Sequence, residues 1–284
     1  MSVNLMVVTD LDGTLLDHYS YDFKPAMSVV SSLKRSGIPL VFNSSKTHSE
    51  MRYLQDQMGL LDPMICENGS AIYLPKDRFR TAQSAWEDHG DFWRISLAKP
   101  REHWLRILAE YPDQGSILSF STMGIQGVMN TTGLDWAGSE RASQREYTEP
   151  LMPPANNEIK QDLTTYLIGK GALVQQGGRF MTVGDSVDKG RAMETLAYFW
   201  RQEYGLPLRT LALGDGLNDV AMLEKANRSV WIRSPVNPIP DLVKQKDWYI
   251  TQECGPKAWA AATQMWLEQH SHLVNSNTVK EHYG

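Results

Sequence analysis

Apolar residues in the first third of the chain form short runs that alternate with amphipathic stretches. Runs at 5–9 and 38–42, and a weaker one at 64–66, predict three strands. Between the first two runs, apolar residues recur at helical spacing over 26–33, with a proline before this stretch and a glycine after it. A strand, a helix and a second strand in succession predict a βαβ unit, and therefore a parallel sheet covered by helices.

This rhythm lapses between about residues 80 and 180 and then resumes. A helix is predicted over 188–204, a strand over 210–213 and a short helix over 219–226. We therefore predict an α/β fold in which a Rossmann-like parallel-sheet core is divided by an inserted second α/β domain. The predicted boundaries are 1–82 and 181–270 for the two parts of the core, 83–180 for the insert and 271–284 for a loose C-terminal tail.

The composition is that of an ordinary folded protein and excludes several classes. A formal net charge of −5 opposes general nucleic-acid binding. The two cysteines are too few for a disulfide scaffold and stand in no metal-binding spacing. No apolar run is long enough to cross a membrane, and the acidic beginning of the chain does not fit a secretory leader. We expect a cytoplasmic protein with no nucleic-acid or membrane partner, and the sequence does not indicate its oligomeric state.

The first chemical signal is DLDGT at 10–14, where an apolar strand ends. Open parallel sheets bind ligands at the carboxyl ends of their strands. Asp10 and Asp12 can face one pocket there, so that one carboxylate attacks or holds a cation while the other moves protons. The alternative is an Asp-rich turn that caps the next element.

The second signal is GDGLND at 214–219, which also follows an apolar strand. Its acids would reach the same edge of the sheet as the first motif. Mg²⁺ prefers carboxylate oxygens, water and phosphate oxygens, so Asp10, the backbone carbonyl of Asp12 and Asp215 form a reasonable site. A plain Gly/Asn/Asp turn is the alternative.

Two further residues suit a phosphoryl site. Ser44 ends the 38–42 run, where a hydroxyl at a helix start could hold a phosphoryl oxygen, although helix capping is the commoner role for an isolated serine. Thr47 with Glu50 forms a capping-box pattern. Lys189 lies at a predicted helix start, where its charge opposes the helix dipole, which indicates another use; a surface lysine is the alternative.

In order and context, these four motifs resemble those of the haloacid dehalogenase-like phosphatase superfamily, and the resemblance covers the whole chain. It implies that Asp10 is a nucleophile that forms an aspartyl-phosphate. Asp12 would then be the general acid toward the leaving alcohol and the base for water. The resemblance further implies phosphoryl binding by Ser44 and Lys189, a Mg²⁺ site at Asp10, Asp12 and Asp215, and support of the metal shell by Asp219.

The insert and several short stretches indicate which branch of the superfamily this chain resembles. Its position between the second and third motifs resembles the cap called C2. SSKT at 44–47, ENG at 67–69, REYTEP at 145–150 and GGRF at 177–180 are similar to one branch, the phosphatases of mannosyl-3-phosphoglycerate. Such a substrate carries a phosphate, a carboxylate and a sugar. The predicted substrate-binding residues are Arg179, Arg145 and Lys46 as cations and Asn68 as an amide. A tight Asn-Gly turn is the alternative for Asn68, and a solvated arginine among acids is the alternative for Arg145.

Other functions stay open on the sequence. A broader sugar-phosphate phosphatase, acting on glucosyl-3-phosphoglycerate or sucrose phosphate, would share all of these motifs. A phospho-receiver or other switch module also uses clustered acids, a hydroxyl and a lysine, but the DxD spacing and the large insert oppose it. A phosphosugar mutase would resemble a pattern with the insert directly after the first motif, where 14–44 leaves room for only one helix.

Overall fold

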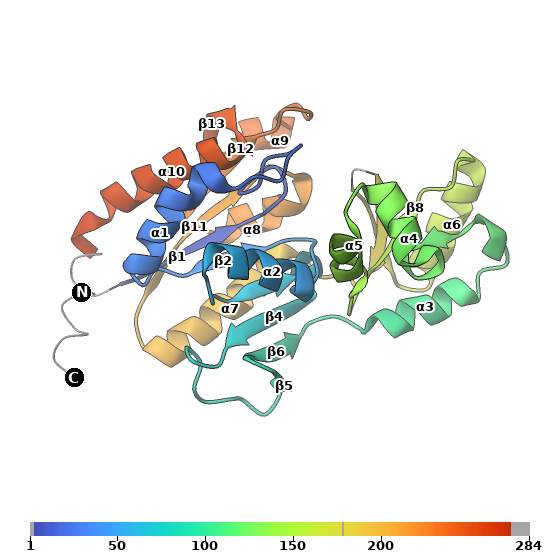
Figure 1. The fold of residues 1–284 in the computed structure, drawn as a ribbon, viewed down its shortest axis with the longest axis horizontal. Coiled ribbons are helices and arrows are strands. Elements are labelled where there is room, and N and C mark those ends of the chain that lie inside the picture. Colours follow the sequence, from blue (N-terminus) through green and yellow to red (C-terminus); the bar gives the residue numbers. More distant parts are fainter. Residues whose placement is uncertain (1–2, 178, 274–284) are drawn as a thin grey trace.

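The computed structural model describes residues 3–177 and 179–273. A sheet of nine strands lies in the larger part of the molecule (Figure 1), in the order β13-β12-β11-β1-β2-β3-β4-β6-β5. The neighbouring pairs from β13 to β3 are parallel, and those from β3 to β5 are antiparallel. Its strands are β1 (Asn4–Thr9), β2 (Leu40–Asn43), β3 (Met64–Cys66), β4 (Ala71–Pro75), β5 (Glu87–His89), β6 (Phe92–Ser96), β11 (Leu208–Gly214), β12 (Arg228–Arg233) and β13 (Tyr249–Cys254).

Helices cover both faces of this sheet. In β1, Leu5 and Val7 face one apolar cluster and Met6 and Val8 face another, because successive side chains of a strand point to opposite faces. Both faces are buried, which explains why β1 reads as a continuous apolar run. The first cluster includes residues of α1 (Met27–Arg35), α2 (His48–Met58) and α10 (Gly255–Gln269), and the second includes residues of α7 (Lys189–Tyr204), α8 (Val220–Lys225) and α9 (Asp241–Lys244).

The insert, called the cap below, has its own antiparallel sheet of four strands in the order β7-β8-β10-β9. A separate apolar cluster around the fully buried Trp104 fills the space between this sheet and its helices. Figure 1 shows the cap to one side of the core sheet. Its elements are α3 (Arg101–Ala109), β7 (Leu118–Ser119), α4 (Phe120–Thr132), α5 (Trp136–Ser143), β8 (Glu149–Met152), α6 (Asn157–Gly169), β9 (Leu173–Gly177) and β10 (Phe180–Gly184), and short 3₁₀ turns lie at Lys24–Ala26, Glu67–Gly69, Gln114–Ser116 and Leu217–Asp219.

The predicted fold class, a parallel-sheet α/β core with an inserted α/β domain, is confirmed. The predicted boundary at residue 83 is wrong, because β5 and β6 pair onto β4 and belong to the core sheet. These are short antiparallel strands without the βαβ rhythm on which the boundary was based. The chain therefore enters the cap after Ser96, and the cap sheet continues through Gly184, beyond the predicted end at 180.

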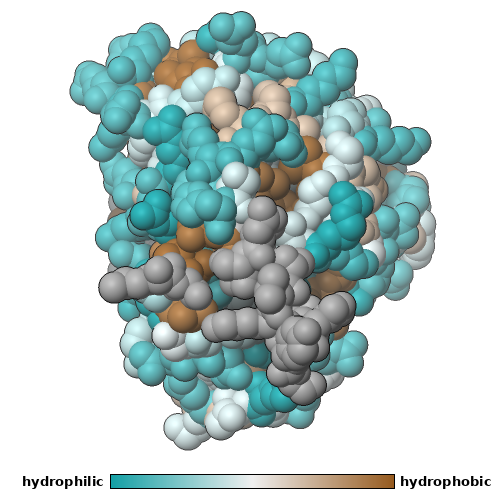
Figure 2. Space-filling model, turned by 90° about the vertical axis from the view of Figure 1, so that its left-hand side faces the viewer, coloured by the Kyte–Doolittle hydropathy of each residue, from teal (hydrophilic) through white to brown (hydrophobic). Residues whose placement is uncertain are grey.

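The end of α10 lies on the side of the core away from the cap (Figure 1). Leu273 packs against the apolar cluster of α1 and α10, and residues 274–284 of the predicted tail lie outside the described residues. Figure 2 shows this end of the molecule, where hydrophilic residues cover most of the surface and hydrophobic residues show in smaller areas. In the described part of the chain, no helix has both the length and the apolar character needed to cross a membrane.

A buried carboxylate joins the cap to the core. Glu67, directly after β3, is 2% exposed and accepts hydrogen bonds from the backbone N–H groups of Glu146 (2.8 Å) and Thr148 (2.8 Å) and from the Thr148 hydroxyl (2.6 Å). The backbone N–H of Tyr147 lies 3.3 Å from the same side chain. Because these amides belong to the segment that leads into β8, Glu67 contributes to holding the cap in position.

We expect Glu67→Ala to destabilise this junction, because it leaves several buried N–H groups without an acceptor. The free energy of unfolding should fall by at least about 2 kcal/mol, and amides 146–148 should exchange faster with deuterium. Glu87→Ala, which removes the half-exposed partner of Arg94, is the matched control and should change stability by less than about 1 kcal/mol. Equal effects of the two substitutions would contradict the role given to Glu67.

Candidate active site

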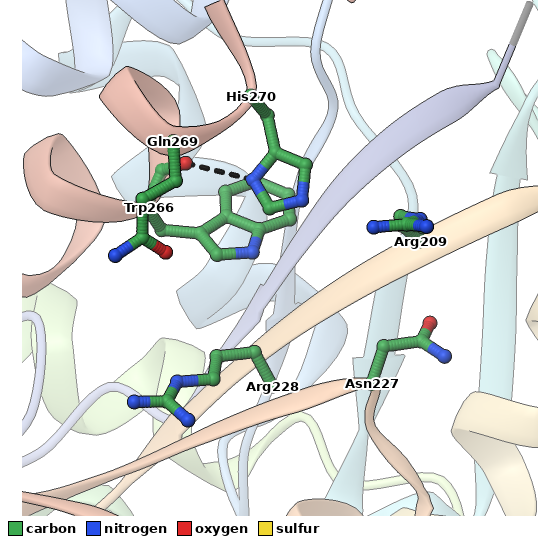
Figure 3. Close-up of a pocket in the computed structure, with 6 residues that line it drawn as sticks. All are labelled: Arg209, Asn227, Arg228, Trp266, Gln269 and His270. Atoms are coloured by element: carbon green, nitrogen blue, oxygen red, sulfur yellow. Dashed lines mark hydrogen bonds between the residues drawn. The ribbon is translucent and has the colours of Figure 1, made fainter.

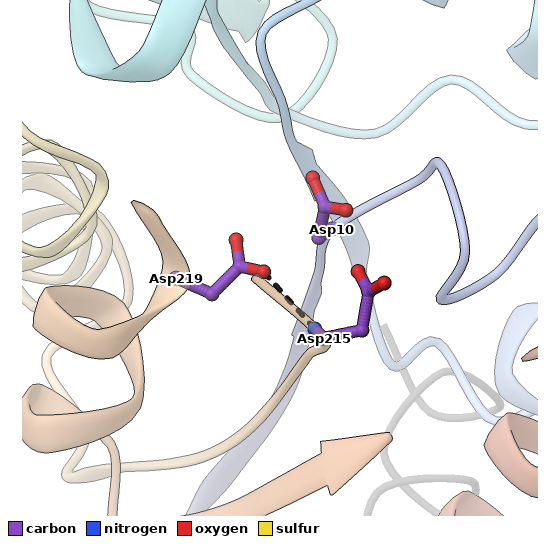
Figure 4. A group of neighbouring side chains, drawn as sticks. All are labelled: Asp10, Asp215 and Asp219. Atoms are coloured by element: carbon purple, nitrogen blue, oxygen red, sulfur yellow. Dashed lines mark hydrogen bonds between the residues drawn. The ribbon is translucent and has the colours of Figure 1, made fainter. Parts of the chain in front are cut away.

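Three carboxylates meet at the carboxyl edge of the core sheet. Asp10 follows β1, and Asp215 and Asp219 follow β11, which pairs with β1 in parallel so that Thr9 lies opposite Leu213. One carboxylate oxygen of each acid lies within 4.8 Å of the others. Figure 4 shows these side chains close together at the ends of the two strands. The prediction that the first and last motifs share one edge is therefore confirmed.

Lys189 lies between two of these acids. Its Nζ is 2.6 Å from Asp10 Oδ1 and 2.6 Å from Asp219 Oδ1, and its side chain is completely buried. Burial disfavours the charged lysine, but the two carboxylates outweigh this effect and raise its pKa, so the ammonium group stays protonated. The alternative of a surface lysine is wrong.

The crowding of acids changes their protonation. Burial, reinforced by Asp219 and opposed by Lys189, raises the pKa of Asp10 from 3.8 to about 7. Burial, with Asp10 and Asp219, raises the pKa of Asp215 from 3.8 to about 8. Without a cation, the cluster therefore binds protons near neutral pH.

Asp219 supports the loop more than it offers a free ligand. Its Oδ2 accepts hydrogen bonds from the backbone N–H groups of Asp215 (3.0 Å) and Gly216 (2.9 Å), and its Oδ1 accepts one from Lys189. Both oxygens thus have protein donors. Asp219 thus fixes the loop that carries Asp215, and its support of a metal shell stays a prediction.

The residues around Asp215 fit a hard divalent cation. Thr14 donates a hydrogen bond to Asp215 Oδ1 at 3.0 Å, which orients the carboxylate. Gly13 has a positive φ of 79°, and a Cβ there would lie 2.5 Å from Asp215 Oδ2, so only glycine allows this close approach. All available donors are oxygens, which are the ligands that Mg²⁺ prefers. Asp10 and Asp215 are therefore the residues that would hold Mg²⁺.

The Asp12 carboxylate does not join this cluster and lies beside a second lysine instead, whereas the predicted metal ligand from Asp12, its backbone carbonyl, stays a prediction. Its Oδ1 is 2.9 Å from Lys46 Nζ, and its side chain is 41% exposed. Five carboxylates, those of Asp10, Asp12, Glu50, Asp215 and Asp219, therefore surround the two ammonium groups of Lys46 and Lys189. A divalent cation would offset part of this excess of negative charge.

Ser44 lies in the loop between β2 and α2 and is almost fully buried. The N-cap of α2 is Thr47, whose side chain forms the predicted capping box with Glu50. Ser44 is therefore not needed as the helix cap. Its Oγ accepts a long hydrogen bond, 3.4 Å from the backbone N of Lys46. That bond does not use the hydroxyl proton, which could be donated to a phosphoryl oxygen.

Asn68 connects the core motifs to the cap. Its Nδ2 donates to Gln175 Oε1 on β9 at 3.4 Å, and its Oδ1 accepts from Asn218 Nδ2 at 3.2 Å. Its positive φ of 59° belongs to a tight turn, as the alternative interpretation expected, but the side chain is also directed between the two domains. Asn68 and Gln175 line a small polar cleft there, together with Thr182 of the cap.

The guanidinium groups of both predicted substrate-binding arginines donate hydrogen bonds to other groups of the protein. Arg145 donates to Thr148 Oγ1 (3.0 Å) and to the backbone carbonyl of Ser45 (2.8 Å), and its side chain is only 8% exposed. Arg179 is exposed and donates to the backbone carbonyl of Thr131 at the end of α4. Among the described contacts, neither arginine touches the acidic cluster, and their role in substrate binding stays a prediction.

Three residues with clear roles at the site were absent from the sequence prediction. They are Thr14, which orients Asp215, Glu67, which holds the cap, and Asn43, whose Nδ2 donates to the backbone carbonyl of Lys189 at 3.1 Å. Their partners are distant in the sequence, so spacing gives no signal for them. The signals available were that Thr14 is the last residue of the first motif and that Glu67 begins the ENG stretch at 67–69.

A second concavity lies at the opposite end of the strands (Figure 3). It has a volume of about 360 Å³ between the beginnings of β11 and β12 and the end of α10. Arg209, Arg228 and His270 lie in its wall, and the residues that the structure describes there include no carboxylate and no hydroxyl. It therefore lacks the groups needed for phosphoryl transfer, and the acidic edge is the candidate active site.

The chain combines a parallel α/β core and an inserted cap with paired acids and a buried lysine. This combination is typical of one class of hydrolases. The profile of the haloacid dehalogenase-like hydrolase family matches residues 7–88 and 152–252, and this chain belongs to that family. A solved haloacid dehalogenase-like hydrolase from Bacteroides thetaiotaomicron shares the fold with a TM-score of 0.66, at 16% identity over 93% of this chain and 99% of that one.

Two relatives are more similar in sequence. Both are named glucosyl-3-phosphoglycerate/mannosyl-3-phosphoglycerate phosphatase. The relative from Persephonella marina is 32% identical over 229 residues, which cover 80% of this chain and 84% of that protein. The relative from Methanococcoides burtonii is 29% identical over 256 residues, which cover 89% and 94%.

We expect the metal-free protein to lose stability as the pH rises. Because the pKa values of Asp10 and Asp215 are raised in the folded state, the folded chain binds more protons than the unfolded chain between about pH 4 and 8. Their contribution to stability is therefore greatest below pH 4 and falls as the pH rises through 7 to 8. Mg²⁺ should reverse this loss, since it binds the ionised carboxylates.

The measurement is the Tm between pH 5 and 9 with a chelator and with Mg²⁺. Mg²⁺ should raise the Tm more at pH 8 than at pH 5, and Asp215→Asn should remove most of that rise. An equal rise at both pH values, or a full rise in the variant, would contradict the assignment of this cluster as the cation site.

Proposed function

We propose that this enzyme, a phosphoric monoester hydrolase of the haloacid dehalogenase-like family, hydrolyses mannosyl-3-phosphoglycerate to mannosylglycerate and phosphate, with Asp10 as nucleophile. The glucosyl ester is the nearest alternative substrate. The observation that carries the proposal is the position of Asp10, which is held by Lys189 at a strand end, beside Asp215 and two residues before Asp12.

In the proposed first step, an Asp10 carboxylate oxygen attacks phosphorus, and the bond between phosphorus and the leaving alcohol oxygen breaks. Asp12 donates a proton to that oxygen, so that the alcohol leaves neutral. In the second step, Asp12 takes a proton from a water molecule, whose oxygen attacks phosphorus and releases Asp10 with inorganic phosphate. Lys189 and the Ser44 hydroxyl offer hydrogen bonds to the phosphoryl oxygens throughout.

The charge of the site explains why a cation is part of the proposal. Phosphoryl transfer depends mainly on positioning and on neutralising charge. Bound Mg²⁺ would supply the positive charge that keeps Asp10 ionised at neutral pH and offsets the charge of the phosphoryl group. Asp10 and Asp215 would hold it, and Asp219 would fix the loop that carries Asp215.

The similar relatives and the cap support the choice of substrate. Both relatives are named for the glucosyl and mannosyl esters of 3-phosphoglycerate. The cleft between core and cap is small, about 10 Å³, and its wall holds acidic and apolar side chains beside the amide and hydroxyl groups of Asn68, Gln175 and Thr182. These amide and hydroxyl groups are of the kind that suits the hydroxyls of a sugar. The cap would cover the substrate and exclude water from the phosphoryl site.

Phosphate release from a panel of esters tests this function. With Mg²⁺, we expect kcat/KM to be highest for mannosyl-3-phosphoglycerate or its glucosyl analogue, and lower for 3-phosphoglycerate, mannose phosphates and sucrose phosphate. Asp10→Asn should lower kcat by about 1,000-fold or more while the Tm stays close to the wild-type value. Asp88→Asn, at an exposed ion pair with Lys76, is the control and should retain full activity.

The outcomes separate the competing functions. Equal and weak hydrolysis of all esters would support the phosphatase activity but contradict mannosyl-3-phosphoglycerate as the substrate. Retained turnover in Asp10→Asn would reject the nucleophile. A single turnover followed by a stable phosphoprotein would instead favour a switch module.

A further inference from the structure

Lys46, the lysine next to Asp12, has different neighbours from those of Lys189. Lys46 Nζ lies 2.9 Å from Asp12 Oδ1 and 3.9 Å from Glu50 Oε1, and it lies over the ring of Tyr21 at 5.5 Å from the centroid. Lys46 itself is 15% exposed, whereas its partner Asp12 is 41% exposed. This ion pair is therefore open to solvent on the side of Asp12, unlike the enclosed pair of Lys189 and Asp10.

Of the two carboxylates next to Lys46, that of Asp12 is easier to replace than that of Glu50. Glu50 Oε2 accepts hydrogen bonds from the backbone N of Thr47 (2.9 Å) and from its hydroxyl (3.1 Å), as part of the capping box. Its carboxylate is thus fixed at the start of α2. The Asp12 carboxylate has no comparable second anchor among the described hydrogen bonds, so a competing anion could replace it at Lys46.

The proposed substrate places such an anion nearby. If Asp12 protonates the leaving oxygen, that oxygen must lie within hydrogen-bond distance of Asp12. In a 3-phosphoglycerate unit the carboxyl carbon is three bonds from this oxygen, which places it within about 4 Å at bond lengths of about 1.5 Å. The substrate carboxylate therefore reaches the neighbourhood of Lys46 without any movement of the cap.

The other basic residues of the site are less suitable for this task. Lys189 is completely buried between Asp10 and Asp219. Arg145 is 8% exposed and bridges Ser45 and Thr148 beside Glu67. Arg179 stands between β9 and β10 of the cap and donates to the backbone carbonyl of Thr131 at the end of α4. Lys46 is the cation that already lies beside the residue in contact with the leaving group.

We propose that Lys46 binds the carboxylate of the glycerate unit and, in doing so, exchanges its ion pair with Asp12 for one with the substrate. This inference rests on the proposed function and specifies the group that selects the substrate. One lysine would thus recognise carboxylate-bearing esters and also release Asp12 to face the leaving oxygen. An ester without the carboxylate would leave the pair of Lys46 and Asp12 intact, and it would be disfavoured in kcat as well as in KM.

Two esters that differ only in this group test the proposal. 3-Phosphoglycerate carries a carboxylate where glycerol 3-phosphate carries a hydroxymethyl group. We expect the wild-type kcat/KM to favour 3-phosphoglycerate by about tenfold or more, and Lys46→Met to reduce this ratio to near one. Lys76→Met, at an exposed ion pair with Asp88, is the matched control and should leave the ratio unchanged.

The ratio separates recognition from a general disturbance of the site. An equal loss on both esters in Lys46→Met, with the wild-type ratio preserved, would overturn the proposal. Loss of the ratio in Arg179→Ala but not in Lys46→Met would overturn it as well and would assign the carboxylate to Arg179.

A binding experiment makes the test independent of turnover. In the Asp10→Asn protein with Mg²⁺, calorimetry should give a Kd for 3-phosphoglycerate about tenfold or more below that for glycerol 3-phosphate, and the added Lys46→Met substitution should make the two values equal. Equal Kd values in Asp10→Asn alone would overturn the role of Lys46 and leave the phosphatase intact. Carboxylate-dependent binding by a protein that hydrolyses no ester would overturn the proposed function alone.

Discussion

A fully buried ammonium group joins carboxylates that lie far apart in the chain, and the geometry of the site depends on this contact. Lys189 bridges Asp10 and Asp219 at 2.6 Å each. A buried charge is costly unless it is paired, so the strand end of β1, the loop after β11 and the start of α7 must stay together. Asn43 strengthens the same junction through the carbonyl of Lys189. The excess of carboxylates that remains is what makes the edge suitable for a divalent cation.

The cap is positioned by a different kind of contact, in which a core carboxylate binds backbone amides. Glu67 and Asn68 both adopt positive φ values, which are unfavourable for residues other than glycine. The hydrogen bonds that Glu67 accepts from the segment before β8 compensate for this strain, and Asn68 donates to Gln175 in the cap. The turn after β3 therefore aligns the cap with the acidic edge of the core sheet.

Much of the fold and half of the site could be predicted because the relevant signals are local. A run of apolar residues that ends in DLDGT or GDGLND marks both a buried strand and the edge at which its acids lie. β5 and β6 were assigned to the cap because short antiparallel strands carry no such rhythm, and only their pairing with β4 places them in the core. Glu67 was overlooked for a related reason, since its partners follow about 80 positions later.

The sequence by itself determined the α/β class, the order of the motifs and the residue types that can carry phosphoryl chemistry, because these depend on periodicity and on the side chains present. The tertiary structure decided which charge meets which. It placed Lys189 with Asp10 and Lys46 with Asp12, and it turned Arg145 toward the joint between the domains. Such pairings depend on distances of a few ångströms between segments that are remote in the chain, and these distances are set only when the sheet, its helices and the cap have packed together.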